Sequence, residues 1–320
     1  MIGRNSEKPT VIVLGTTYSG SGAVYDFLSS RQDCYDPLKG SEYLLPQLPY
    51  GLMSLRAATG QAFHHATADH AFRKFLIVAE MLARPKGLFV FGKNFEVILP
   101  GFMNEIKRFM DEITISRFPF HIAWWDINKS STKKMMDFFI ERFFRMNKNV
   151  QDSYLPVQES VFIELSQKMH ERIFSIPSSD EYQFILLNQA GSGLNPISST
   201  DFFRKRKVVV VTRDPRDQYA EMKLFKKAKN VSEFIKWYKA ISDRINFSHP
   251  DMYNLKFEEF VLNHNLQANA LCEFAGITDS ICSLYDPEKS KKNISKFRNI
   301  LSVKELAEID KYLAQYYSSF

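Results

Sequence analysis

The chain has 320 residues, a net charge of +6 at pH 7 and 45% hydrophobic residues, a composition typical of a folded globular protein. This length excludes a minimal domain and allows either one large α/β domain or two smaller ones. The cysteines are Cys34, Cys272 and Cys282; their odd number, without a Cys-x-x-Cys spacing, argues against a disulfide framework and a thiolate zinc site.

The chain begins with a short polar segment, Met1 to Lys8, which is followed by the apolar run Val11–Leu14. This run is far too short for a signal peptide or a membrane span, and no later stretch reaches eighteen consecutive apolar residues. The cysteine pattern also fits a reducing compartment. We therefore expect a cytoplasmic protein without a transmembrane segment.

Short apolar runs alternate with helical patterns along most of the chain. Four runs are typical of buried strands, and the valine-rich one is the clearest. The expected strands are Val11–Leu14, Phe184–Leu187, Lys207–Thr212 and Met252–Phe257. The expected helices are Ser21–Ser30, Ser130–Met146, Gln158–Phe174, Gln218–Lys226, Val231–Phe247, Asn265–Ala275 and Val303–Tyr316.

This order of elements predicts an α/β fold in which a central parallel sheet is flanked by helices. No linker rich in Pro, Gly or Ser separates two halves of the chain, so we expect one domain over residues 1–320. The middle of the chain, about 51–176, is expected to be a largely helical insertion in that domain.

A glycine-rich loop, Gly15-Thr16-Thr17-Tyr18-Ser19-Gly20-Ser21-Gly22-Ala23, follows the first expected strand. Glycines let the backbone turn sharply and present successive N–H groups to one side. The helix that begins near Ser21 adds the positive end of its dipole, and the hydroxyls of Ser19 and Ser21 can donate hydrogen bonds. The loop therefore predicts a P-loop-like phosphate cradle without a charged side chain.

Two widespread phosphate-binding loops differ from this one. A kinase or NTPase loop ends in Gly-Lys-Ser/Thr, and Ser21 stands here in the position of that lysine. The spacing of Gly15, Gly20 and Gly22 is also wrong for the Gly-x-Gly-x-x-Gly loop of dinucleotide-binding folds. The missing lysine argues against a P-loop kinase or NTPase.

A second motif follows the valine-rich strand, where the chain reads Arg213-Asp214-Pro215-Arg216-Asp217. Ligands of open α/β sheets bind at the carboxyl ends of the strands, which is where Arg213 is expected. Asp214 is a good N-cap and Pro215 a good first-turn residue for the next helix. Alone, the motif is explained by capping and by ion pairs with nearby acids; with the first loop, it indicates a second anion-binding element.

Together the two motifs resemble those of the sulfotransferases that use PAPS (3′-phosphoadenosine 5′-phosphosulfate). In that family a Ser-Gly-Ser/Thr core binds the 5′-phosphosulfate, and an Arg-Asp-Pro-Arg-Asp motif holds the 3′-phosphate. The resemblance extends to Asn254–Phe260, to Asn265–Ile277 and to the basic segment Lys289–Arg298. It covers both ends of the chain and leaves out the middle, about 51–176.

The resemblance implies a PAPS-binding set. Its members are Tyr18, Ser19, Gly20, Ser21, Gly22, Ala23, Arg213, Glu221, Lys291, Lys292 and Asn293. Two of them depart from the family, because Tyr18 replaces a Lys or Arg and Glu221 replaces a serine that binds the 3′-phosphate. Lys93 or a basic residue of the C-terminal segment could supply the first charge. At the second position, either the helix is shifted or Glu221 faces a neighbouring lysine such as Lys223.

Sulfuryl transfer to a hydroxyl needs a general base, and Glu42 is the preferred candidate. A glutamate occupies this stretch in family members that use a carboxylate, although a solvent-exposed loop glutamate explains the residue equally well. The rival bases are the histidines His64, His65, His70 and His121. His121, which precedes a pair of tryptophans, could instead line an acceptor cleft.

The resemblance implies transfer to a carbohydrate hydroxyl, as in polysaccharide biosynthesis, without a metal. The alternatives are a non-catalytic nucleotide-binding protein on the same fold and a P-loop kinase or NTPase. The positive net charge suits an anionic partner, but no nucleic-acid motif is present and we expect no nucleic-acid partner. The sequence leaves the acceptor and the oligomeric state open.

Overall fold

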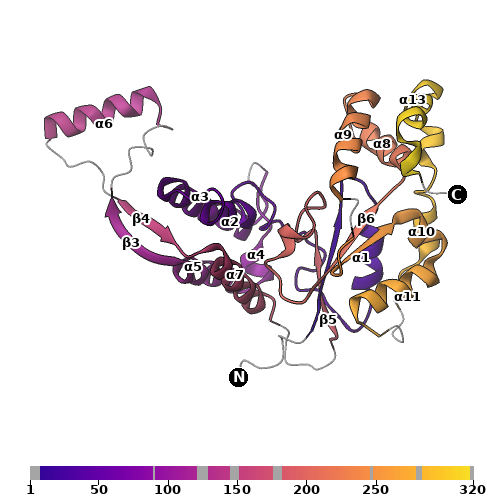
Figure 1. The fold of residues 1–320 in the computed structure, drawn as a ribbon, viewed down its shortest axis with the longest axis horizontal. Helices are drawn as coiled ribbons and strands as arrows, with labels where there is room; N and C mark the ends of the chain where they lie inside the picture. Colours follow the sequence, from indigo (N-terminus) through magenta and orange to yellow (C-terminus); the bar gives the residue numbers. More distant parts are fainter. Residues whose placement is uncertain are drawn as a thin grey trace. The chain divides into compact units, whose positions relative to one another are not determined.

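The computed structural model describes residues 8–88, 91–120, 129–144, 151–175, 182–245, 248–278 and 283–317. The chain divides into two compact units (Figure 1). The first combines Met1–Gln47 with His170–Phe320, and the second is Leu48–Met169. The expectation of one domain over the whole chain stays a prediction.

A parallel sheet with the strand order β2-β5-β1-β6-β7 forms the centre of the first unit. Its strands are β1 (Thr10–Gly15), β2 (Cys34–Tyr35), β5 (Phe184–Asn188), β6 (Arg206–Thr212) and β7 (Met252–Lys256). The predicted α/β class is thus confirmed. Val11 to Leu14 are buried on both faces, as in other parallel sheets covered by helices.

Helices surround this sheet in the first unit (Figure 1). They are α1 (Ser21–Ser29), α8 (Pro215–Leu224), α9 (Val231–Ile245), α10 (Phe257–Leu262), α11 (His264–Ala275), α12 (Pro287–Lys291) and α13 (Val303–Leu313). Val11, Val13, Val209 and Val211 of the sheet pack with residues of α1, α10 and α11 in one buried cluster. Residues of α8, α9 and α13 form a second cluster. The position of α1 and α8 in these clusters fixes the loops that precede them.

The central position of β1 determines where a ligand can bind. β1 pairs with β5 on one side and with β6 on the other. Connections therefore diverge at its carboxyl end, and this kind of switch point is where open α/β sheets bind their ligands. Both sequence motifs follow strands that meet at this edge.

The second unit is mainly helical, as predicted. Its helices are α2 (Leu52–Thr59), α3 (His65–Ala83), α4 (Phe95–Ile98), α5 (Phe102–Glu112), α6 (Ser131–Phe144) and α7 (Glu159–Ile173), which continues into the first unit. The unit also contains an antiparallel pair, β3 (Thr114–Phe120) and β4 (Gln151–Pro156), that was not predicted. A half-buried strand normally buries its apolar side chains and exposes its polar ones. These strands show the opposite arrangement, because Ile115 is exposed and Ser153 is buried.

Candidate active site

The glycine-rich loop joins β1 to α1, as predicted, and its shape requires glycine at position 20. Gly20 is the N-cap of α1 and has φ +84°, in the left-handed region that favours glycine. A Cβ at this position would lie 2.5 Å from the ring of Phe257. No side chain caps α1, so the start of the helix is open to an anion, although the Ala23 N–H already donates to the Gly20 carbonyl at 3.1 Å.

Two hydroxyls of the loop are placed for a ligand. The Ser19 side chain is buried, and within the described chain its Oγ has no hydrogen-bond partner. The Oγ of Ser21 accepts a hydrogen bond from Nε2 of Gln189 at 3.1 Å, so its own proton remains available for donation. The same glutamine accepts from the Gly15 N–H at 3.4 Å and thereby links the ends of β1 and β5 to the loop.

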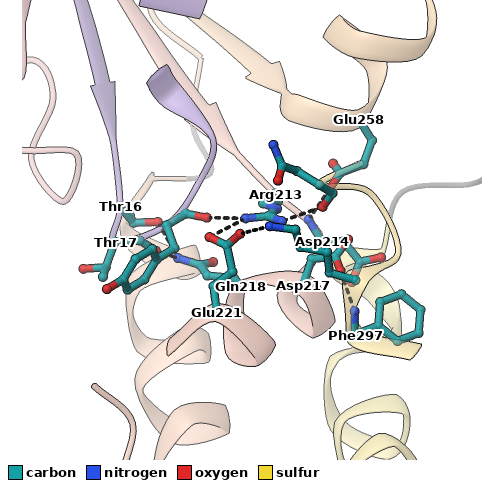
Figure 2. A network of polar contacts seen from close by, with 12 residues as sticks. Thr16, Thr17, Arg213, Asp214, Asp217, Gln218, Glu221, Glu258 and Phe297 are labelled. Atoms are coloured by element: carbon teal, nitrogen blue, oxygen red, sulfur yellow. Dashed lines mark hydrogen bonds and ion pairs between the residues drawn. The ribbon is translucent and has the colours of Figure 1, made fainter. Parts of the chain in front are cut away.

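Gln218 of α8 holds the loop from the other side. Its amide nitrogen donates to Thr16 Oγ1 at 3.1 Å and to the carbonyl of Thr17, and its side chain is almost fully buried (Figure 2). Tyr18 has φ +59°, and its ring stacks on Phe225 with a centroid distance of 5.3 Å. The loop is therefore held in one conformation by contacts on both sides.

Arg213 lies at the carboxyl end of β6, as predicted, with 4% of its surface exposed. Its guanidinium donates to the carbonyl of Tyr18 at 3.1 Å and to that of Asn293 at 2.6 Å. Among the described residues, no partner is found for its buried Nε–H. Arg213 therefore connects the glycine-rich loop to the C-terminal segment.

The residues after Arg213 start helix α8 in the predicted way. Asp214 caps the helix by accepting from the N–H of Arg216 at 2.8 Å, and Pro215 occupies the first turn. The Asp214 N–H donates to the buried carboxylate of Glu258 at 2.9 Å (Figure 2). These contacts fix the direction of α8, which carries Glu221 about two turns further on.

Glu221 faces a lysine, which was one of the two alternatives, but that lysine is Lys296 and not Lys223. Its carboxylate lies 3.1 Å from Arg213 Nη1 (Figure 2). It also lies 3.1 Å from Lys296 Nζ, whereas Lys223 pairs with Glu305 at 2.8 Å. Burial opposes ionisation of Glu221, but the nearby charge of Arg213 and the hydrogen bond from Lys296 lower its pKa overall. The carboxylate is therefore charged at neutral pH.

Asp217 ties the C-terminal segment to α8. Its carboxylate accepts from the N–H groups of Ser295 at 2.7 Å and Phe297 at 2.9 Å. Arg216 lies against the ring of Phe297 and against that of Tyr317, at 4.5 and 3.9 Å from the two centroids. The segment that follows α12 is thus held in place by the second motif itself.

A cavity of about 270 Å³ brings the two motifs together. Its lining consists of Tyr18, Gly20, Gly22, Ala23, Asp26, Arg213, Glu221, Phe257, Ser290 and Asn293. Most of the residues predicted to bind a nucleotide are in this set. Lys291 instead pairs with Glu288, and Lys292 is exposed at the surface. Ser19 and Ser21 do not line the cavity, whereas Gly20, Gly22 and Ala23 beside them do, so a negatively charged group in the cavity would lie at the start of α1.

Glu42 lies at the same edge of the sheet. It forms a parallel bridge with Asn188, the last residue of β5, and the next residue donates its N–H to the Asn188 carbonyl at 2.9 Å. β5 is the strand between this bridge and β1, so Glu42 lies two strand spacings, about 10 Å, from the end of β1. Its role as the base stays a prediction.

The rival histidines belong to the second unit. Nδ1 of His64 caps α3 by accepting from the Ala66 N–H, and the rings of His64 and His65 are stacked. His70 makes an edge contact with the ring of Tyr50. His121 lies outside the described residues. Lys93, which was considered as a replacement for the missing loop charge, is also in the second unit.

Comparisons with known proteins add the following. No family model matches the chain, and no curated protein matches it. The sulfotransferase domain of the Synechococcus PCC 7002 olefin synthase is 10% identical over 98% of this chain and 97% of that chain, with a TM-score of 0.46. The sulfotransferase domain of the curacin biosynthetic pathway is 12% identical over 96% and 98%, with a TM-score of 0.40. A sulfotransferase from Alicyclobacillus acidocaldarius is 12% identical over 98% and 97%, with a TM-score of 0.37.

All three of these solved structures are sulfotransferases. Two further properties follow from the described part of the chain. It contains no helix with the length and apolar character needed to cross a membrane. It also contains no group of three or more His, Cys, Asp or Glu residues arranged to hold a metal ion.

Several site residues were missed from the sequence. Gln189 and Gln218 hold the loop through side-chain amides, and Asp217 holds the C-terminal segment. Phe257 closes the space beside Gly20, and Asp26 lines the cavity with a pKa raised by burial. The one available signal was position, because Gln189 lies two residues after the predicted strand Phe184–Leu187.

Proposed function

We propose that the chain is a sulfotransferase that moves the sulfonate group of PAPS to a hydroxyl of a carbohydrate acceptor. The observation that carries this proposal is the cavity in which the glycine-rich loop and Arg213 meet. The loop offers N–H and O–H donors that can bind a phosphosulfate, and it has Ser21 where an NTPase has lysine. We keep a single cytoplasmic domain and a role in polysaccharide biosynthesis as parts of the proposal.

The reaction is an in-line displacement at sulfur. The acceptor oxygen forms a new bond to sulfur while the bond between sulfur and the oxygen of the 5′-phosphate breaks, and the nucleotide leaves with that electron pair. Ser21 and the first turn of α1 stabilise the negative charge on the phosphosulfate. Glu42 takes the proton of the acceptor hydroxyl. The chain thus mainly positions groups and offsets charge, as in phosphoryl transfer.

A second candidate is a nucleotide-binding protein without catalysis. Tyr18 leaves the loop without the charge that the family places there, and the Arg213–Glu221 ion pair occupies a predicted phosphate ligand. Both features are compatible with binding and do not require turnover.

The test combines transfer and binding. The full chain is incubated with ³⁵S-labelled PAPS and a panel of mono- and oligosaccharides, and nucleotide binding is measured by calorimetry. Labelled sugar supports the proposal, whereas binding without transfer to any acceptor favours the second candidate. Magnesium-dependent ATP hydrolysis that is lost in Ser21→Ala would instead identify an NTPase. The absence of both binding and transfer overturns the proposal.

A further inference from the structure

We propose that Glu221 is a specificity-determining residue that cancels the affinity a ribose 3′-phosphate would otherwise contribute. This inference rests on the proposed function and deepens it, because it concerns which nucleoside 5′-phosphosulfates the cavity accepts. The consequence is that the chain binds adenine nucleotides with a 3′-hydroxyl and with a 3′-phosphate about equally well.

The first step is the charge at the Arg213 end of the cavity. Arg213 lines the cavity, and the carboxylate of Glu221 lies 3.1 Å from both Arg213 Nη1 and Lys296 Nζ. Arg216, the other cation of the motif, is paired with Asp214 at 2.6 Å. The charges of Arg213, Lys296 and Arg216 are therefore already offset by carboxylates of the chain.

The second step is the cost of bringing a phosphate to this place. Glu221 lines the cavity, and the side chains of Glu221 and Arg213 are only 16% and 3% exposed. A phosphate carries a charge of about −1.5 to −2 at neutral pH. It must either lie beside the Glu221 carboxylate or displace it, and displacement leaves a partly buried carboxylate without its cations. Both outcomes offset the attraction of Arg213.

The third step concerns which ligand group can bind beside Glu221 in the cavity. A hydroxyl is uncharged and can donate to the carboxylate of Glu221, which lines the cavity. A ribose hydroxyl therefore brings no negative charge beside that carboxylate, while the 5′-phosphosulfate lies at the start of α1. Dinucleotide-binding folds use the same chemistry, with an acid for a ribose hydroxyl and an arginine for a ribose phosphate.

The fourth step is that Glu221 cannot easily turn away. It lies on α8, whose start is capped by Asp214, and Asp217 of the same helix anchors the segment that carries Lys296. Helix, carboxylate and lysine are thus parts of one hydrogen-bonded unit. The ion pairs of Glu221 with Arg213 and Lys296 are therefore already formed in the free protein.

The experiment compares two nucleotides on the full chain. Adenosine 5′-phosphate and adenosine 3′,5′-bisphosphate are titrated by calorimetry at one ionic strength. For the unmodified chain we expect dissociation constants within about threefold of each other. Glu221→Gln keeps the shape and removes the charge, so it is expected to tighten the bisphosphate at least about tenfold, a change of ~1.4 kcal/mol, and to leave the monophosphate within about threefold.

The matched control is Glu288→Gln, which removes the same charge from the exposed partner of Lys291 outside the cavity lining. It should change neither affinity by more than about twofold. Lys296→Met provides an independent measurement if Glu221→Gln fails to fold. It makes this end more negative and should weaken the bisphosphate more than the monophosphate, by at least about threefold.

Three results overturn the inference. The first is an unmodified chain that prefers the bisphosphate by more than about tenfold. The second is a Glu221→Gln variant with an unchanged ratio of affinities, and the third is a Lys296→Met variant that weakens both nucleotides equally. These results differ from failure of the proposed function itself, because in that case the unmodified chain would bind neither nucleotide.

Discussion

The two ends of the cavity meet anions in different ways. At one end, the glycine-rich loop offers N–H and O–H donors and no charged side chain, and the hydroxyl of Ser21 keeps its proton available for donation. At the other end, Arg213 carries a full charge, but Glu221 already neutralises it at 3.1 Å. The comparison teaches that a charged side chain in a predicted phosphate site need not supply net charge, whereas an uncharged loop can remain open to an anion.

Arg213→Ala should have the largest effect, because it removes the ion pair with Glu221 and both hydrogen bonds of the guanidinium. Arg213→Ala leaves the partly buried Glu221 with Lys296 alone and removes the link to Tyr18 and Asn293. Breaking a buried ion pair on one side costs about 3–5 kcal/mol, and the exposure of Lys296 favours the lower value here. Urea unfolding should show this loss of stability, and calorimetry should show weaker nucleotide binding.

A double variant separates the two consequences. Arg213→Ala combined with Glu221→Gln removes both charges, so most of the stability should return while nucleotide binding stays weak. Unchanged nucleotide affinity in Arg213→Ala would remove the second motif from the site.

The proposed base should affect the rate of transfer and not the binding of the nucleotide. Glu42→Gln keeps the size of the side chain and removes its ability to take a proton, so the turnover number should fall by about 100-fold or more. The affinity for adenosine 5′-phosphate should stay within about twofold. The measurement is kcat with labelled PAPS, and a variant with full activity would assign the role to a histidine.

A substitution at Gly20 tests whether the glycine-rich loop needs its left-handed backbone conformation and its close approach to Phe257. Gly20→Ala must place a Cβ 2.5 Å from the Phe257 ring at φ +84°, so we expect a loss of stability of about 1–3 kcal/mol and weaker nucleotide binding. Gly22→Ala is the control, because a Cβ there meets nothing within 4 Å and lies inside α1. Its stability should be unchanged or higher by up to about 1 kcal/mol. Equal losses in the two variants would contradict the tight approach of Phe257.

Sequence patterns predicted the structural features that depend only on residues close together in the chain. Gly20 and Gly22 marked the loop, the four valines before Arg213 marked β6, and Asp214 marked the start of α8. Each of these residues affects the backbone of its own segment. Such features can therefore be predicted from a short stretch of sequence. The parallel sheet followed from the same reasoning, since buried strands on both faces read as continuous apolar runs.

Contacts between distant segments could not be predicted in this way. Gln189 meets Ser21 across 168 positions, and Lys296 meets Glu221 across 75. Lys223 was the natural partner of Glu221 from sequence distance alone, but a helix places residues two apart on different faces. The strands β3 and β4 were missed because burial there does not follow residue polarity: Ile115 is exposed and Ser153 is buried.

The smallest effect is expected from the exposed lysines of the C-terminal segment, which sharpen the contrast between charges inside and outside the cavity. Neutralising Lys291 and Lys292 as Gln should weaken nucleotide binding by about two- to fivefold, because exposed charges are well solvated and Lys291 is already paired with Glu288. The effect should grow at low salt, where screening is weaker. Calorimetry at two salt concentrations measures it, with Lys304→Gln and Lys311→Gln on α13 as the control pair of equal charge. A loss that is larger than that of Arg213→Ala, or that does not depend on salt, would mean that these lysines contact the nucleotide directly. Long-range attraction would then not explain their contribution.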